Sequence, residues 1–285
     1  MKDSSISTNE QSLTDRLRLP VFGILLLSVW AVISLTNFVG DYRQLLYQST
    51  RESGFYEWLT VLAGLTITAI AISRIRASFK SDVKDLLPVP ILWIFAIIGV
   101  LGSLEEISWG QHIFGFESQG VFKEHNLQQE TNLHNFVSQE YVNLLMQGFV
   151  YLVFIALPIL SYLNIIAIMN KIPQGLQRLR PSLPTVGIFL TSCCFQDYFR
   201  AETYLDTTLV IFLTVVYLIA AVRVAWTSEQ KLISLSVLIS LVLAMVCDPV
   251  FEYNNMQYEI RELFILVGFI FWFLETGESS RQSIA

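Results

Sequence analysis

The feature that most constrains this chain is a series of long apolar runs that contain no charged residue. The run from 86 to 104, LLPVPILWIFAIIGVLGSL, has nineteen residues, which is the length that a helix needs to cross the hydrocarbon core of a bilayer. Only 15% of the 285 residues are charged, whereas a soluble domain normally carries about 25%. The sequence therefore predicts an integral membrane protein and excludes a soluble globule.

Similar runs predict an all-α, polytopic transmembrane helix bundle with about eight spans. The runs lack the alternation of barrel strands, and a helix satisfies its own backbone hydrogen bonds within lipid. Residues 1–18 are expected to form a disordered cytoplasmic tail, and residues 276–285 a second cytoplasmic tail. The transmembrane domain would occupy residues 19–275, with spans at about 19–40, 55–73, 86–104, 141–169, 182–197, 207–224, 231–248 and 259–275.

The basic residues predict that both termini are cytoplasmic. With the N-terminus inside, the predicted outer segments contain only five of the 18 basic residues, namely Arg43, Arg51, Lys123, Arg200 and Arg261. Lysine and arginine are retained on the cytoplasmic side of membrane proteins, so this orientation is favoured. The same topology places most of the acids and all three histidines outside, where an acidic surface would attract cations.

Several acids fall at the predicted outer ends of helices, where an ionisable side chain is costly unless it is paired, hydrated or metal-bound. The acids at the starts of predicted helices are Glu57, Glu259 and Glu262. The helix dipole stabilises these three, but it disfavours Glu105, Glu106 and Asp248, which lie at C-terminal helix ends. The dipole therefore gives no structural reason for the Glu105–Glu106 pair, and we favour a functional role for it.

The stretch EEISWGQHIFGFESQGVFKEHNLQQETNLHN, residues 105–135, gathers all three histidines beside this pair. If the preceding helix continues, one face would carry Glu105, Ser108, Trp109 and His112. Gly110 can break the helix before His112 is reached.

Two further pairs are spaced four residues apart, which brings side chains together on one helix face. Glu130 and His134 form the first pair, and Asp248 and Glu252 form the second. Pro249 disfavours a regular helix at the second pair, because proline removes a backbone hydrogen bond.

Histidine and carboxylate side chains in one cluster suit Zn, Fe or Mn, which accept mixed nitrogen and oxygen ligands. The candidate metal ligands are Glu106, His112, Glu130 and His134. The candidate catalytic residues are the same four together with Glu105 and Ser108. Two alternatives stay open: a metal-free acid/base site, and a hydrogen-bonded loop that caps the bundle. A Ser108–His112–Glu105 triad is disfavoured because a rigid helix rarely aims a serine at a histidine on its own face.

Three motifs, EWLT at 57–60, EEISWGQ at 105–111 and QQETNLHN at 128–135, resemble those of a group of bacterial multi-pass membrane proteins. The likeness covers mainly residues 53–135 and implies one constellation of side chains and a bacterial cytoplasmic (inner) membrane location, but no reaction. The supporting residues of this constellation would be Glu57, Trp109, Gln111, Asn132 and Asn135. From the helix-end argument, Asp248, Glu252 and Glu262 are added as further supporting residues.

These features favour a membrane-embedded hydrolase or transferase that acts on a lipid or lipid-linked substrate at the extracytoplasmic face. The enzyme would work either with a bound metal or without one. Arg200 would bind a substrate phosphate, and the expected partners are membrane lipids rather than nucleic acid. A proton- or cation-coupled transporter is the alternative, since intramembrane acids carry ions in many carriers. No inverted repeat supports a carrier. A non-catalytic assembly or scaffold subunit is the third hypothesis.

Overall fold

The computed structural model describes residues 12–38, 54–80, 85–126, 129–133, 136, 145–165, 177–196, 204–224, 226–246 and 256–282. Every regular element in these ranges is a helix, which confirms the predicted all-α fold class. Within them, six helices are long and apolar enough to cross a membrane: α1 (Leu13–Phe38), α3 (Phe55–Lys80), α4 (Val89–Glu106), the helix Leu145–Tyr162, α11 (Tyr204–Val224) and α12 (Ser228–Val246). The architecture is that of a multi-pass integral membrane protein.

Two more helices, α10 (Leu183–Cys193) and α14 (Met256–Gln282), lie at the remaining positions where spans are predicted. The start of α1 and the end of α14 both reach into the segments predicted as tails. The two segments support each other, because the backbone N–H of Thr14 donates to Glu278 Oε1 at 3.1 Å. This contact links opposite ends of the sequence, so hydropathy along the chain does not reveal it.

The fourth helix changes its winding before Pro158. Residues Val150–Ala156 form a π-helical segment, and α8 (Leu157–Tyr162) continues from it with the proline in its first turn. Proline cannot donate a backbone hydrogen bond, and a wider turn is one way in which a helix accommodates it.

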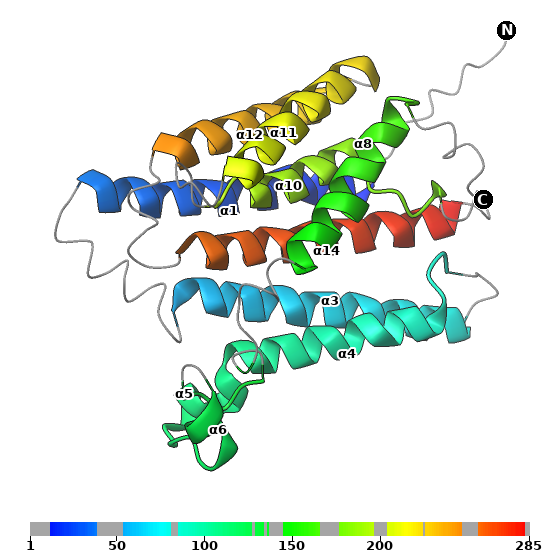
Figure 1. Cartoon of the computed structure of the whole chain (residues 1–285). Coiled ribbons are helices and arrows are strands. Elements are labelled where there is room, and N and C mark those ends of the chain that lie inside the picture. Colours follow the sequence, from blue (N-terminus) through cyan, green and yellow to red (C-terminus); the bar gives the residue numbers. More distant parts are fainter. Residues whose placement is uncertain are drawn as a thin grey trace, which may run out of the picture.

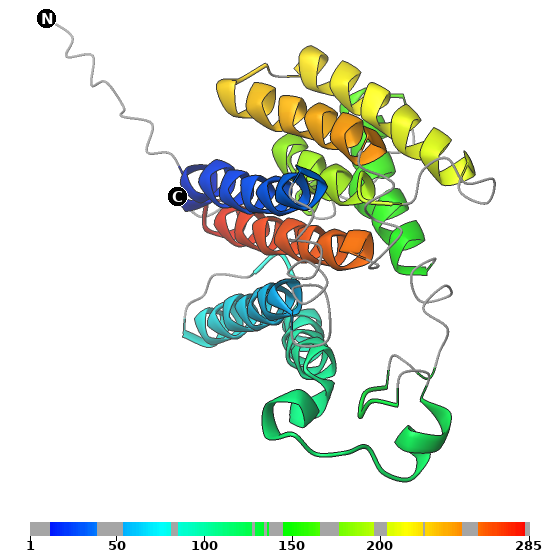
Figure 2. The same ribbon diagram turned by 90° about the vertical axis from the view of Figure 1, so that its left-hand side faces the viewer.

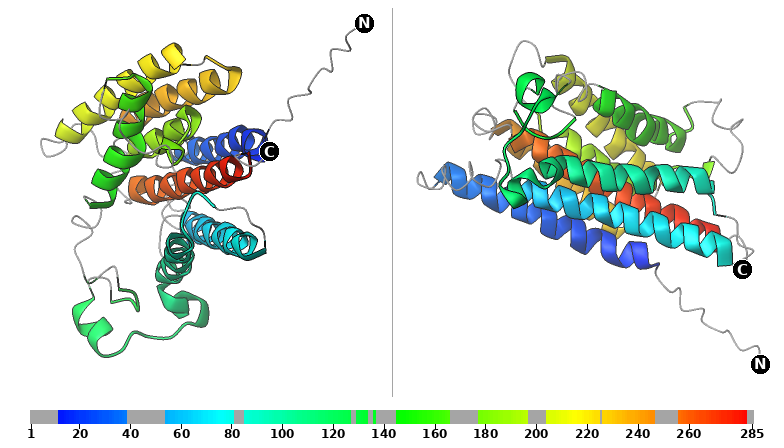
Figure 3. Two further views of the ribbon diagram at one scale, coloured as in Figure 1. Left: turned by 90° about the vertical axis from the view of Figure 1, so that its right-hand side faces the viewer. Right: turned by 90° about the horizontal axis from the view of Figure 1, so that it is seen from below.

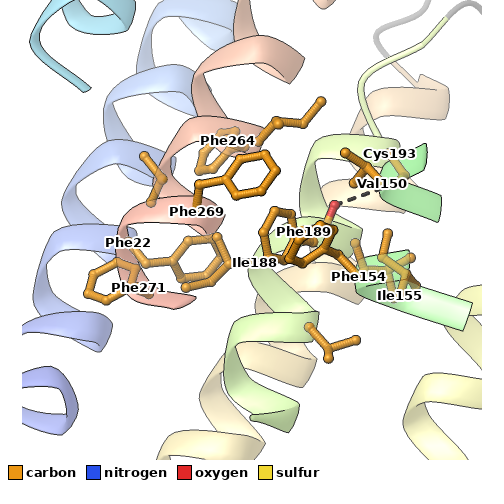
Figure 4. Packing of buried hydrophobic residues seen from close by; sticks show 14 of the residues in the cluster. Phe22, Val150, Phe154, Ile155, Ile188, Phe189, Cys193, Phe264, Phe269 and Phe271 are labelled. Carbon is orange, nitrogen blue, oxygen red and sulfur yellow. Dashed lines mark hydrogen bonds between the residues drawn. The ribbon is translucent and has the colours of Figure 1, made fainter. Parts of the chain in front are cut away.

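Helix α14 lies in the middle of the bundle, packed against α3, α10 and α1 (Figures 1 and 2). Its aromatic side chains meet those of its neighbours in the core (Figure 4): the ring centroids of Phe154 and Phe269 lie 4.9 Å apart, as do those of Phe154 and Phe189. A Cβ atom at Gly268 would lie 2.6 Å from the Phe189 ring, so the glycine allows α10 to approach α14 closely.

Helices α3 and α4 form a closely packed pair held by small and hydroxyl-bearing residues. A Cβ atom at Gly99 would lie 2.6 Å from the carbonyl oxygen of Gly64. Thr68 Oγ1 donates to the carbonyl of Ala96, and Ser103 Oγ donates to that of Val61, both at 3.1 Å. Close backbone approach through small residues is the usual way in which helices associate inside a membrane.

The first residues of α3 and α14 and the last of α4 meet at the end of the bundle opposite the chain termini (Figure 1). We call this the acidic end, defined by Glu57, Glu105, Glu106, Glu259 and Glu262. The short helices α5 (Gln111–Phe114) and α6 (Val121–His125) lie beside it, outside the main bundle (Figures 1 and 3). Arg18 and Arg74 lie at the opposite end, which we call the basic end after them. Their acidic partners there are Asp85, Glu229 and Glu275.

Candidate functional site

The end of α4 separates the two adjacent glutamates into different surroundings. The helix ends at Glu106, and Ile107 is its C-cap. Ser108 and Trp109 follow with φ angles of 45° and 54°, in the left-handed region that side chains rarely adopt. The helix therefore does not continue into the following loop, and it breaks before Gly110 rather than at it.

Glu105 turns toward the loop and holds it. Its Oε1 accepts a short hydrogen bond from the indole Nε1 of Trp109, and its Oε2 accepts one from the backbone N–H of Leu133 at 2.6 Å. Gln111 reinforces this attachment, because its Oε1 accepts the backbone N–H of Thr131 at 2.7 Å. The predicted proximity of Glu105 and Trp109 is therefore present, although no continuous helix produces it.

A buried polar network holds Glu130 inside the loop. Glu130 Oε2 accepts from Ser108 Oγ at 2.8 Å and from Asn132 Nδ2 at 2.6 Å. Asn126 completes the network, accepting the backbone N–H of Glu130 at 3.1 Å and donating to Asn132 Oδ1 at 2.9 Å. These contacts agree with the hypothesis of a hydrogen-bonded loop that caps the bundle. The catalytic and ligand roles of Glu130 and Ser108 stay predictions.

Glu106 turns the other way, toward the first turns of α14. One carboxylate oxygen each from Glu106, Glu259 and Glu262 lies within 4.8 Å of the others, and all three residues are half-buried. We call these three residues the glutamate cluster. Glu259 and Glu262 are three residues apart and share one face of α14, which is why both meet the end of α4. Glu57, in the first turn of α3, lies close enough to interact electrostatically with Glu106 and Glu259.

The glutamate cluster has the spacing of a cation site. Oxygens on opposite sides of one bound cation are about 4–5 Å apart, twice the usual metal–oxygen distance. Among the described residues, no lysine or arginine forms an ion pair with Glu106, Glu259 or Glu262. Carboxylates at this separation repel one another unless a cation or bound protons neutralise them. Oxygen ligands alone favour hard cations such as Mg²⁺, Mn²⁺ or Ca²⁺.

The structure places some of the predicted site residues and not others. The following lie outside the described residues: His134, Asn135, Arg200, Asp248 and Glu252, together with the side chain of His112. His125 is exposed on α6. Of the four predicted metal ligands, Glu106 alone is placed in the glutamate cluster, and Glu130 lies in the loop network. Glu262 and Glu57 were predicted only as supporting residues.

Glu259 is the member of the cluster to which the sequence assigns no site role. The helix dipole already explains an acid in the first turn of a helix, so the sequence gives no reason to assign Glu259 a further role. The spacing of Glu259 and Glu262 was the available signal, since an i, i+3 pair of acids at a membrane interface needs neutralisation.

These features define a class of protein: a polytopic helical membrane protein with a carboxylate cluster at one end of its bundle. No family model, no curated protein and no solved structure matches this chain. The functional assignment therefore depends on the geometry of the site.

Proposed function

We propose that the protein is a membrane-embedded enzyme, a hydrolase or transferase, in which the glutamate cluster binds a divalent cation. It would act on a lipid or lipid-linked substrate at the extracytoplasmic face of the bacterial cytoplasmic membrane. The observation that carries this proposal is the convergence of Glu106, Glu259 and Glu262 from two helices that are far apart in the sequence.

The cation would supply the chemistry that carboxylates alone lack. A bound Mn²⁺ or Mg²⁺ polarises a phosphoryl or carbonyl oxygen and activates a water molecule as a nucleophile at neutral pH. Glu57 lies near the cluster and would accept the proton that this water loses. Zn or Fe would need a nitrogen ligand as well, and His112 and His134 remain the candidates for it.

Substrate access from the lipid phase is supported by the surfaces around the cluster. Helix α4 packs mainly on α3 and exposes large apolar side chains, including Ile94, Ile97 and Leu101. The loop beside the acidic end exposes Trp109 and Phe114. Aromatic side chains of this kind suit the headgroup layer, so a lipid substrate would reach the cluster without leaving the membrane.

Manganese binding to the purified protein tests the proposal directly. After dialysis against a chelator, the wild-type protein in detergent should bind Mn²⁺, measured as the loss of the free-ion signal in electron paramagnetic resonance. Glu106→Gln and Glu262→Gln should each weaken binding by at least about tenfold, as loss of a ligand or its support typically does. Glu124→Gln, which removes an exposed acid from α6, is the matched control and should bind normally.

Absence of Mn²⁺ and Zn²⁺ binding to the wild-type protein would overturn the metal-dependent enzyme. If the cation binds, proteoliposomes distinguish an enzyme from a carrier. Cation-dependent turnover of phospholipids or lipid-linked phosphates supports the enzyme. Uptake of the cation that Glu106→Gln abolishes, without lipid turnover, would instead show a transporter.

A further inference from the structure

A buried arginine lies next to the glutamate cluster in sequence but on a different side of α14. Arg261 is 4% exposed, and its Nη2 has no hydrogen-bond partner. Its guanidinium lies over the ring of Tyr258, with Cζ 4.7 Å from the ring centroid. No described carboxylate lies within ion-pair distance of it. A buried guanidinium without an ion-pair partner is costly, so its presence requires an explanation.

A second buried donor without a partner follows the end of α10, a helix that packs on α14. Gln196, just beyond the end of α10, is 5% exposed, and its Nε2 has no hydrogen-bond partner. The preceding residue, Phe195, stacks on Phe264 with ring centroids 5.7 Å apart, and Phe264 is one turn beyond Arg261 on α14. Both unpaired donors therefore belong to the interface between α10 and α14.

The described neighbours of Arg261 do not provide the missing acceptor. Tyr151 and Cys193 lie near enough to interact with its charge, and neither is an anion at neutral pH in a buried setting. Among the described residues, Glu262 interacts electrostatically with Arg261, but its carboxylate lies beyond ion-pair distance. An arginine guanidinium and the NH₂ of an amide are donors only, so a ligand that satisfies either of them must be an acceptor. The planar fork of arginine matches the oxygens of a phosphate better than any neutral acceptor.

We propose that Arg261 and Gln196 bind a phosphate group at the acidic end of the bundle. This inference rests on the proposed function and deepens it, because it assigns the substrate to the phosphorylated lipids. Arg261 is one of the two residues between Glu259 and Glu262 in α14, so one short segment of this helix would bind both the cation and the phosphate. A lipid headgroup and free phosphate share the required chemistry, and the experiment separates them.

Calorimetric titration of the purified protein in detergent tests this site with three probes: inorganic phosphate, short-chain phosphatidic acid, and diacylglycerol of the same chain length. Phosphatidic acid should bind and diacylglycerol should not. Arg261→Met should weaken phosphatidic acid binding by at least about tenfold, because a charge-assisted hydrogen bond is lost. Gln196→Leu should weaken it by about threefold or more. Lys123→Met, which removes an exposed loop charge, should have no effect.

Binding of phosphatidic acid that is equal in the wild type and in Arg261→Met would overturn the site, as would no binding to the wild type. If Arg261→Met does not fold, the affinity of Gln196→Leu decides. Binding of inorganic phosphate as well shows that the phosphate alone is recognised, and binding of the lipid alone shows that the headgroup is recognised with its chains. Mn²⁺ affinity without phosphate should persist in Arg261→Met, and phosphatidic acid binding should persist in Glu106→Gln, so failure of either proposal is visible separately.

Discussion

The charged residues at the two ends of α14 differ in whether described residues of the protein pair with them. At the basic end, Glu275 accepts hydrogen bonds from Ser182 Oγ at 2.5 Å and Thr185 Oγ1 at 2.6 Å, and pairs with Arg18 at 3.0 Å. These contacts join α1, α10 and α14. The carboxylate is thus surrounded by donors that the protein itself provides.

A second ion pair repeats this arrangement at the basic end. Arg74 pairs with Asp85 and also donates to the carbonyl of Phe273 at 2.7 Å and to Thr276 Oγ1 at 2.8 Å. It thereby ties the end of α3 to α14. The five residues that define the basic end are thus all in ion pairs within the described part of the fold.

At the acidic end, the glutamate cluster has no described basic partner, and Arg261 has no described acidic one. Opposite charges occur within one turn of α14, yet they face different neighbours. Among the described residues, ion pairs to α14 therefore form at the basic end and not at the acidic end. Unpaired charges at the other end are the expected state of a site whose partners are ligands.

The largest effect should come from breaking a pair at the basic end. Arg74→Met leaves Asp85 buried without its cation, which should lower the free energy of unfolding by about 3–5 kcal/mol. Thermal unfolding in detergent, followed by circular dichroism, measures this change. Arg76→Met, two residues further along the same helix and exposed, should change stability by less than about 0.5 kcal/mol. Equal effects of the two substitutions would show that the buried pair does not stabilise the protein.

The next effect concerns the position of α4, which brings Glu106 to α14. Gly99→Ala forces a methyl group against the Gly64 carbonyl and should cost about 1–3 kcal/mol. Because it separates α4 from α3, it should also weaken Mn²⁺ binding. Gly102→Ala, whose Cβ meets no atom within 4 Å, should preserve both stability and affinity. A tight Mn²⁺ site in Gly99→Ala would mean that Glu106 is not positioned by this helix pair.

Substitution of the adjacent residues Glu105 and Glu106 should change the free energy of unfolding in opposite directions. In the presence of a chelator, Glu106→Gln should raise the free energy of unfolding by about 0.3–1 kcal/mol, because it removes an acid from a helix C-terminus and from a repulsive cluster. Glu105→Gln should lower it by about 1 kcal/mol, because it weakens two hydrogen bonds that hold the loop. Thermal unfolding with and without Mn²⁺ measures both.

Added Mn²⁺ should stabilise the wild type and Glu105→Gln, but not Glu106→Gln, since a ligand stabilises only the form that binds it. A chelator-treated Glu106→Gln protein that is less stable than the wild type would contradict the repulsion inferred at the acidic end.

The most localised effect should be confined to the loop. Ser108→Ala removes a donor to Glu130 and should cost about 0.5–1.5 kcal/mol. Amide hydrogen exchange should accelerate at Glu130 and Thr131, while the helices keep their protection. Gln119→Ala, at an exposed position of the same loop, is the control. Exchange that spreads into α4 would show that the loop network supports the bundle as well.

Most of the fold can be predicted from the sequence, because backbone polar groups within lipid must form their hydrogen bonds inside the protein. The runs at 55–73, 86–104 and 207–224 coincide with α3, α4 and α11, since a charge-free segment of that length must satisfy its hydrogen bonds internally. The early start of α1 could not be foreseen, because it depends on contacts of Thr14 and Arg18 with the far end of the chain.

The site was predictable in part. The negative charge of Glu106 at a helix C-terminus singled this residue out in the sequence, and the structure places its carboxylate near that of Glu262. The functional role of Glu106 stays a prediction. The neighbours of Glu130 were not predictable, because left-handed backbone at Ser108 and Trp109 leaves no periodic signal. Arg261 reads as one of a few outer bases, and the lack of an ion pair to any described carboxylate appears only when the packing is known.

Helix α14 runs without a proline or a break from Met256 to Gln282, through both ends of the bundle. It therefore behaves as a rod, and a displacement along its axis has the same size at either end. Occupancy of the glutamate cluster that draws Glu259 toward α4 would pull equally on the anchors of Glu275 at the other side of the membrane. The ion pairs of the basic end would therefore resist any movement of α14 along its axis that a ligand at the acidic end produces.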